Sequence, residues 1–251
     1  MIMVVLKTAR EIEVMREAGR ISARALQLAG KAVEPGVTTA EIDRIVRQYI
    51  EGEGAKPSFL GYSGFPASAC ISVNQEVIHG IPGHRVLKAG DIVSVDIGAY
   101  YKGFHGDNAW TFPCGEISKE AQALLDATKN SLFEGIAQAK AGNRIGDVAN
   151  AVQRYAEARG YSVVRQFVGH GVGAGLHESP EVPNFGTPGR GVRLLPGMTI
   201  AIEPMINAGV KEVTVLKDGW TTVTADGKLS AHFEHSVAIT PDGPLILTLP
   251  D

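Results

Sequence analysis

The sequence predicts one α+β domain made of two similar units packed together. Two helical segments precede a series of strands in the first half of the chain, and the second half repeats that order. No low-complexity linker separates the halves, so we expect a single domain over residues 1–251, with halves of about 8–115 and 116–251. Five residue pairs recur 106 positions apart: Gly36 and Gly142, Ile42 and Val148, Val46 and Val152, Tyr49 and Tyr155, and Leu26 and Leu132. A chance match is the alternative, because helical periodicity is common.

Capping-box spacing predicts the start of each helix in the first half. Thr8 and Glu11 precede apolar residues at helical intervals, which indicates a long amphipathic helix. Thr38 and Glu41 open a second helix, which the glycine-containing stretch 52–57 stops.

Short apolar or alternating runs predict strands from residue 69 onward. Thr221–Gly227 is interpreted as a strand that enters an Asp-Gly hairpin turn. The other expected strands and helices are strands at 69–73, 91–97 and 107–112, helices at 118–140 and 145–159, and strands again from Val163 to the end.

The composition argues against several classes of protein. With 44% hydrophobic residues the chain can bury a large core, and a net charge of -3 without runs of like charge gives no field that attracts nucleic acid. Cys70 and Cys114 are expected to be free thiols in a reduced compartment. The apolar run Met1–Leu6 is shorter than a signal-peptide core, and no run approaches the roughly 18 apolar residues of a membrane span. We therefore expect a cytoplasmic protein without membrane contact.

Two carboxylates interrupt runs that otherwise read as buried strands. Asp96 lies in Ile92–Gly98, and Glu203 lies in the still more apolar Met198–Met205. Burying an unpaired charge costs several kcal/mol, so a metal ion, a basic residue or protonation must compensate each acid. The two acids are 107 positions apart, which would place them equivalently in the two units.

Three further residues complete a candidate metal site. Asp107 and Glu234 lie at strand edges, and glycines flank His170. Four carboxylates carry a charge of -4, which two divalent ions would neutralise. A carboxylate-rich set with one imidazole suits Co, Mn, Fe or Zn as a pair that polarises a carbonyl.

Each residue also has a simpler explanation when taken alone. A single strand carboxylate is more often an ion-pair partner or a turn residue than a metal ligand. A single histidine is more often packed or exposed, although His79, His170 and His177 all lie among glycines and prolines, in segments suited to lining a cleft.

Seven short segments carry a resemblance to a known family through their sequence and their order: Cys70–Asn74, Ile78–Pro82, Ser94–Gly98, Gly106–Asn108, Gly169–Gly171, Ile202–Pro204 and Phe233–His235. In this order they resemble methionine aminopeptidase, the bacterial type I form without an N-terminal zinc-binding extension, from about residue 8 to 240. The resemblance implies a metal-dependent peptidase with a pita-bread (creatinase/aminopeptidase) fold, in which two pseudo-twofold related halves hold a dinuclear site.

The resemblance also implies the role of each site residue. Asp96 would chelate one metal, Asp107 and Glu234 would bridge both, and His170 and Glu203 would complete the shell of the second metal. Glu203 would also handle the proton. His79 would position the substrate amide or shuttle a proton, and His177 would contact the scissile carbonyl or its tetrahedral adduct.

A methionine side chain would enter a pocket built from five residues, with Leu176 nearby: Phe59, Tyr62, Phe65, Cys70 and Trp220. Apolar and aromatic walls suit a thioether. The sequence departs from the family pattern at three positions. Phe59 stands where the family commonly has cysteine, Phe65 where it has tyrosine, and Leu176 where it has phenylalanine. Ordinary core packing is the alternative for these side chains, and Trp220 could serve stability alone.

The expected activity is removal of the initiator methionine from peptides and nascent chains, with a preference for a small second residue. A proline-directed aminopeptidase or prolidase on the same fold is one alternative, although those relatives usually carry an extra N-terminal domain. A non-catalytic peptide-binding relative is the other, although such relatives lose metal ligands. We expect a monomer, and ribosome contact is consistent with nascent substrates although no basic patch indicates it.

Overall fold

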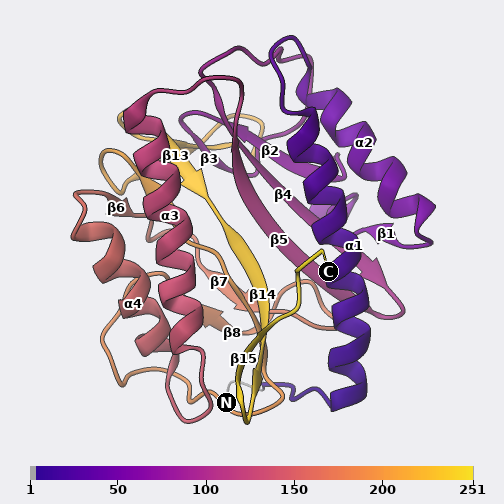
Figure 1. The fold of residues 1–251 in the computed structure, drawn as a ribbon, viewed down its shortest axis with the longest axis vertical. Helices are drawn as coiled ribbons and strands as arrows, with labels where there is room; N and C mark the ends of the chain where they lie inside the picture. Colours follow the sequence, from indigo (N-terminus) through magenta and orange to yellow (C-terminus); the bar gives the residue numbers. More distant parts are fainter. Residues whose placement is uncertain (1–3, 251) are drawn as a thin grey trace.

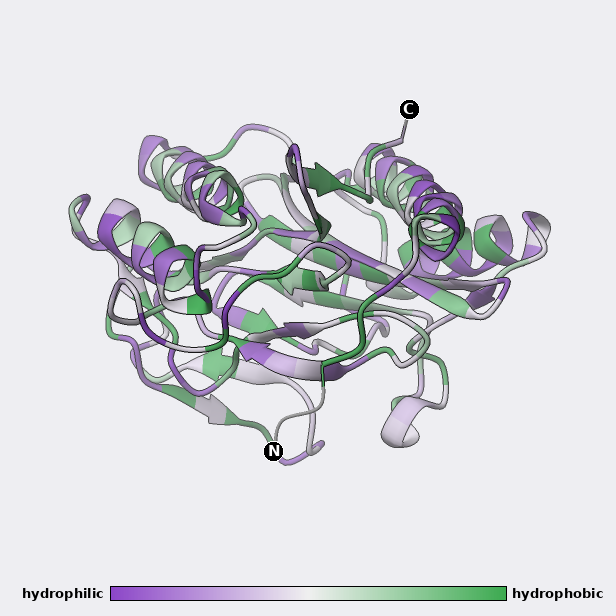
Figure 2. Ribbon diagram, turned by 90° about the horizontal axis from the view of Figure 1, so that it is seen from below, coloured by the Kyte–Doolittle hydropathy of each residue, from purple (hydrophilic) through white to green (hydrophobic). Residues whose placement is uncertain are grey.

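The computed structural model describes residues 4–250, in which two pairs of helices cover one face of a curved antiparallel sheet (Figure 1). Figure 2 shows both helix pairs on the same side of the strands. The helices are α1 (Ala9–Ala32), α2 (Thr39–Gly52), α3 (Lys119–Gln138) and α4 (Ile145–Glu157), with a short 3-10 turn at Tyr62–Gly64. None of these described helices is long and apolar enough to cross a membrane.

Both predicted capping boxes are confirmed. The hydroxyl of Thr8 accepts a hydrogen bond from the Glu11 N–H, and the Glu11 carboxylate accepts one from the Thr8 N–H. Thr38 and Glu41 form the same pair of bonds at the start of α2. Each box satisfies two N–H groups that a helix end would leave unpaired, so these short polar motifs fix where the helices begin.

The central sheet has nine strands, in the order β1-β4-β5-β14-β9-β7-β8, with β2 also paired to β4 and β15 to β14. Two small three-stranded sheets, β13-β10-β6 and β11-β12-β3, lie beside it. The strands are β1 (Lys56–Pro57), β2 (Ala69–Val73), β3 (Glu76–Ile78), β4 (Ile92–Tyr101), β5 (Phe104–Pro113), β6 (Ser162–Val163), β7 (Gly169–Gly171), β8 (Glu178–Val182), β9 (Thr199–Ile202), β10 (Met205–Asn207), β11 (Val213–Val215), β12 (Thr222–Thr224), β13 (Ser230–His232), β14 (Glu234–Thr240) and β15 (Gly243–Ile246).

The predicted Asp-Gly hairpin after residue 221 is wrong. A strand is present as β12, but it pairs with β11 and β3, whereas the next strand, β13, pairs with β10. The turn is tied elsewhere, because the Asp226 carboxylate accepts hydrogen bonds from the N–H groups of Val210 and Lys228. Tertiary contacts therefore override the local turn signal.

The internal repeat is visible in the backbone just before α2 and α4. Gly36 and Gly142 adopt nearly the same left-handed conformation, with φ of 95° and 94°. The Gly36 N–H donates to the carbonyl of Leu87 at 2.9 Å, and the Gly142 N–H donates to the carbonyl of Leu194 at 3.0 Å. The 106-residue spacing therefore corresponds to a repeated local structure.

Each helix pair covers its own apolar core. One core joins α1 and α2 to β2 and β4 and contains Ile42 and Val95, while the other joins α3 and α4 to β9 and β14 and contains Leu132 and Ile202. Trp110 on β5 packs against both cores. Burial of this apolar surface, at about 25 cal/mol per Å², holds the helices on the sheet and leaves the other face for polar groups.

Helix α1 crosses β5 where two glycines meet. A Cβ atom at Gly106 would lie 2.5 Å from the Cα of Gly19. We expect Gly106→Ala to push α1 off the sheet and to lower the free energy of unfolding by about 1–3 kcal/mol, as overpacking does. Urea unfolding of the purified variant measures this change.

Gly52→Ala is the matched control, because nothing lies within 4 Å of an added Cβ there. This variant should change the free energy of unfolding little, or raise it by up to about 1 kcal/mol through helix propensity. If the two variants lowered stability equally, the close approach of α1 to β5 would not be the constraint we infer.

Candidate metal centre

Five adjacent strands of the central sheet each supply one candidate ligand. Asp96 lies on β4, Asp107 on β5, Glu234 at the start of β14, Glu203 directly after β9 and His170 on β7. These strands are consecutive neighbours in the sheet. The residues span 139 positions of sequence, and the strand order brings them together.

The register explains why three of the acids share one face. Asp96 and Glu234 both pair with Ala109, from opposite sides of β5. Asp107 is two residues from Ala109, and residues two apart on a strand point to the same side of a sheet. The sheet therefore directs all three carboxylates to the face away from the helices.

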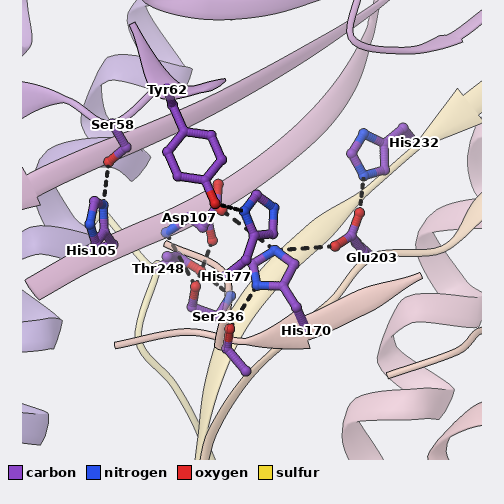
Figure 3. A network of polar contacts seen from close by, with 11 residues as sticks. Ser58, Tyr62, His105, Asp107, His170, His177, Glu203, His232, Ser236 and Thr248 are labelled. Atoms are coloured by element: carbon purple, nitrogen blue, oxygen red, sulfur yellow. Dashed lines mark hydrogen bonds and ion pairs between the residues drawn. The ribbon is translucent and has the colours of Figure 1, made fainter. Parts of the chain in front are cut away.

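The ligand atoms lie close enough to bind a common ion. One ligand atom from each of Asp107, His170 and Glu234 lies within 4.8 Å of the others. The Nε2 atom of His170 is 3.8 Å from Oδ2 of Asp107 and 3.5 Å from Oε1 of Glu203, as Figure 3 shows. The cluster is largely screened from solvent, with Asp107 3% and Glu234 2% exposed.

The tautomer of His170 leaves one nitrogen free for coordination. Its Nδ1 atom lies 2.8 Å from the carbonyl oxygen of Gly171. A carbonyl only accepts hydrogen bonds, so Nδ1 carries the proton and Nε2 keeps its lone pair. This arrangement of a backbone carbonyl behind an imidazole is typical of metal-binding histidines.

Unpaired buried oxygens show that the donor set fits divalent cations. Asp96 Oδ1, Asp107 Oδ1 and Glu234 Oε1 are buried without a hydrogen-bond partner among the described residues. Such atoms are costly unless a cation neutralises them. Oxygen-rich donors with one imidazole are a set that first-row divalent metals accept.

Burial and mutual repulsion raise the pKa values of the carboxyl groups. Burial raises the pKa of Asp107 to about 7. Burial, and then the charge of Asp107, raise the pKa of Asp96, and the same causes raise the pKa of Glu234. For Glu203, burial is followed by the charge of Asp96 as the cause of a raised pKa. Without a metal, the site therefore holds protons that a bound cation would displace.

All twelve residues singled out from the sequence line one cavity of about 150 Å³. The ligand candidates form one part of its wall, and Leu176 and Ser63 also line it. A larger hollow of about 540 Å³ against α4 is lined by none of these residues. The other residues brought to the cavity are Phe59, Tyr62, Phe65, Cys70, His79, His177 and Trp220.

The wall opposite the acids is apolar and aromatic. Phe59, Phe65, Cys70 and Leu176 form one buried cluster, and Trp220 packs edge-on against Phe65 with ring centres 5.1 Å apart. Cys70 on β2 is paired with Asp96 on β4, so a residue of the apolar wall and one of the acids lie side by side on neighbouring strands. Both cysteines are free thiols, as predicted.

Two further histidines, His79 and His177, line the same cavity. The Nδ1 atom of His177 is 2.8 Å from the hydroxyl of Tyr62, and its ring centre is 4.2 Å from that of His170 (Figure 3). His79 has φ of +58°, a left-handed conformation that is uncommon outside glycine and that concentrates at functional sites. Burial lowers the pKa of His79 to about 4 and also lowers the pKa of His177, so both rings are neutral at pH 7.

The sequence pattern did not identify two residues that contact Glu203. Nε2 of His232 is 3.6 Å from Oε2 of Glu203, and Nδ2 of Asn184 donates to the Glu203 carbonyl at 2.9 Å. His232 could have been found, because it lies two residues before Glu234 in a short polar cluster. Asn184 carries no local signal, since only the tertiary fold brings it to Glu203.

Known proteins similar to this chain include two bacterial enzymes. Methionine aminopeptidase of Clostridium perfringens is 57% identical over 98% of this chain and 99% of its own length. Methionine aminopeptidase 1 of Bacillus subtilis is 53% identical, with the same coverage of both chains. The crystal structure of methionine aminopeptidase from Thermotoga maritima superposes with a TM-score of 0.97 at 46% identity, covering 98% of this chain and 99% of that chain.

The likeness to the Thermotoga maritima structure confirms the predicted α+β pita-bread fold. The family model described as metallopeptidase family M24 matches residues 13–241. That match covers most of the chain and includes all of the candidate ligands. The chain therefore belongs to metallopeptidase family M24.

Proposed function

We propose that this chain removes the N-terminal methionine from peptides and nascent proteins by two-metal-assisted hydrolysis. The observation that carries the proposal is the single cavity, in which a cluster of unpaired acids faces an apolar aromatic wall. Relatives of nearly the same length that are named methionine aminopeptidase support it. Their high identity also weighs against a proline-directed peptidase and against a non-catalytic binding protein.

Asp96, Asp107, His170, Glu203 and Glu234 would hold the metals. Two bound divalent ions would polarise the peptide carbonyl, activate water and take the free α-amino group, which restricts cleavage to an N-terminus. The choice among Co, Mn, Fe and Zn depends on cellular supply as well as on affinity, because these ligands suit several ions.

The two neutral histidines stabilise and position the substrate. When the Tyr62 hydroxyl donates to Nδ1 of His177, Nε2 carries the proton and can donate it in a hydrogen bond to the oxygen of the scissile carbonyl. A donor placed where negative charge develops lowers the barrier more than it strengthens ground-state binding. His79 contacts Trp220 edge-on, with ring centres 6.1 Å apart, and from there it holds the substrate amide or relays a proton.

Glu203 handles the proton. Its carboxylate lines the cavity beside the other candidate ligands, where it can accept a proton from the attacking water and return that proton to the leaving amine. Asn184 holds the backbone of Glu203 through its hydrogen bond to the Glu203 carbonyl, and Nε2 of His232 lies 3.6 Å from Oε2 of the Glu203 side chain.

The apolar wall selects the methionine side chain. Phe59, Phe65 and Trp220 present carbon surface, and Cys70 contributes a buried thiol whose pKa burial raises well above its ordinary value. A thioether makes favourable contacts with aromatic rings and loses little on leaving water. The cavity of about 150 Å³ leaves little room beyond one side chain, which favours a small second residue.

The setting of the enzyme is part of the same proposal. Nascent chains supply the substrate, the enzyme works in the cytoplasm as a monomer, and contact with the ribosome would deliver substrates as they emerge. Gel filtration of the purified protein and sedimentation with ribosomes test these points separately from the chemistry.

Metal removal provides the direct test of the activity. We expect a chelator to abolish methionine release from Met-Gly-Met-Met, and Mn, Co, Fe or Zn to restore it when added singly. Chromatography of the products measures the release. A peptide beginning Ala-Pro serves as the control and should stay intact, whereas its cleavage would favour the proline-directed alternative.

Met-Ala and Met-Leu peptides test the preference for a small second residue, and equal rates would refute it.

Substitution separates ligands from groups that act on the substrate. Asp107→Asn should lose metal, because an amide cannot supply the charge that balances the cations. His79→Ala should retain metal and lower kcat by about 10²–10⁴-fold, as removal of a proton-transfer group does. Atomic absorption and steady-state kinetics measure the two effects. Equal metal loss in both variants would contradict this division.

The contribution of protonated Asp107 to the stability of the metal-free protein should fall as the pH rises from about 4 to about 7, and should be lost above about 7. The folded-state pKa of Asp107, about 7, lies above the ordinary value of 3.8. A group whose pKa is raised on folding stabilises the folded state fully when the pH is below its pKa in the unfolded state. This contribution is lost as the pH rises through its pKa in the folded state. Bound metal displaces the proton from Asp107, so this titration no longer makes the stability of the protein depend on pH.

The buried histidines act over nearly the same pH range with the opposite sign. Burial lowers the pKa of His232 to about 3 and that of His235 to about 4, both from 6.5. Their contribution rises with pH up to about 6.5 and is constant above about 7. Urea unfolding of the metal-free wild-type protein and of metal-free Asp107→Asn at about pH 5 and pH 7 isolates the Asp107 carboxyl group, because the histidines contribute equally to both proteins. The same change of stability with pH in the two proteins would refute the prediction.

A further inference from the structure

The turn between β7 and β8 carries two residues of the cavity. It covers residues 172–177 and follows the strand of His170, and both Leu176 and His177 line the cavity. Its position therefore sets where the His177 ring and part of the apolar wall lie. The contacts that hold this turn come from the first residues of the described chain.

A buried ion pair ties the turn to the N-terminal segment. Nζ of Lys7 contacts Oε2 of Glu178, the residue after His177, with only 4% of the lysine side chain and 16% of the glutamate side chain exposed. The other oxygen, Oε1, accepts a hydrogen bond of 2.9 Å from the N–H of Gly175 within the turn. One carboxylate therefore joins the lysine to the turn.

The lysine is fixed on its other side. Its ammonium also donates to the carbonyl of Val5 at 3.2 Å, and its backbone N–H donates to the carbonyl of Gly197 at 2.7 Å. The next residue, Thr8, caps α1, the helix that packs on β4 and β5. The ion pair thus links the turn to the strands that carry Asp96 and Asp107.

The turn packs tightly around this ammonium. A Cβ atom at Gly173 would lie 2.7 Å from Nζ of Lys7 and 2.6 Å from Oε1 of Glu178. The Gly173 carbonyl accepts a hydrogen bond from the His105 N–H at 2.9 Å, so β5 also holds the turn. Gly173 therefore leaves no room for a side chain beside the ion pair.

We propose that Lys7 is a positioning residue for catalysis, which through Glu178 holds His177 and Leu176 at the cavity. The proposal rests on the proposed function for the roles of those two residues. Removing one partner of a buried ion pair leaves the other charge uncompensated, so the carboxylate would turn toward water and release Gly175. A shift of about 1 Å in a catalytic group can lower the rate by about 100-fold.

Lys7→Met keeps the length of the side chain and removes its charge. We expect kcat/KM for a methionyl peptide to fall about 10- to 100-fold while both metals stay bound. Lys102→Met is the matched control, because Lys102 forms an exposed ion pair with Glu17 of α1, with 54% and 42% of the two side chains exposed. The control should keep wild-type kinetics, and equal losses in the two variants would overturn the proposal.

A spectroscopic measurement distinguishes positioning from general destabilisation. The imidazole ¹⁵N signals of His177 report its hydrogen bond to Tyr62, and the signals of His235 on β14 report the sheet. In Lys7→Met we expect the His177 signals to move and the His235 signals to stay. Unchanged His177 signals would overturn the proposal whether or not the wild-type protein cleaves methionyl peptides. Absent wild-type cleavage would instead count against the proposed function alone.

Glu178→Gln provides a second variant if Lys7→Met fails to fold. A glutamine oxygen can still accept from the Gly175 N–H, but the charge that holds Lys7 is lost. We expect the same movement of the His177 signals with a smaller fall in kcat/KM. Wild-type signals together with wild-type kinetics in this variant would overturn the proposal.

Discussion

The central constraint in this molecule is that four carboxylates and one imidazole face one small buried space. Each acid alone would cost several kcal/mol to bury as an ion, and each neighbour adds repulsion. These side chains lie on the face of the sheet away from the helices, where five adjacent strands hold them in fixed register. The apolar cores under the helices supply the stability that makes the arrangement tolerable.

Rigidity around the acids comes from polar contacts that extend the sheet. The ladder between β5 and β14 covers only two residue pairs, ending at His235 and Asn108. Ser236 continues it, since its hydroxyl donates to the Asp107 carbonyl at 2.8 Å and accepts from the Asp107 N–H at 3.2 Å (Figure 3). The strand that bears Asp107 is therefore held on both sides, which preorganises the site before any metal arrives.

Much of the fold and of the site could be predicted from local patterns. Helix starts followed from capping boxes, and Asp96 and Glu203 stood out because acids rarely interrupt apolar strands. The pairing of β12 could not be predicted, because the Asp226 carboxylate binds the distant Val210 N–H as well as the Lys228 N–H of its own turn. Asn184 and the pair of Lys7 and Glu178 were also missed, since their partners lie far away in sequence. Local sequence patterns therefore identify the buried charged residues. The residues that hold them in place can be identified only from the tertiary structure.

The distribution of the candidate ligands along the chain has a consequence for biosynthesis. Asp96 and Asp107 precede the second pair of helices, whereas His170, Glu203 and Glu234 follow α4. A growing chain therefore cannot assemble the candidate centre until both pairs of helices and the strands that follow them have been synthesised. Until Glu234 has emerged, a nascent copy cannot act on any substrate, so only finished molecules can process chains that are still being synthesised.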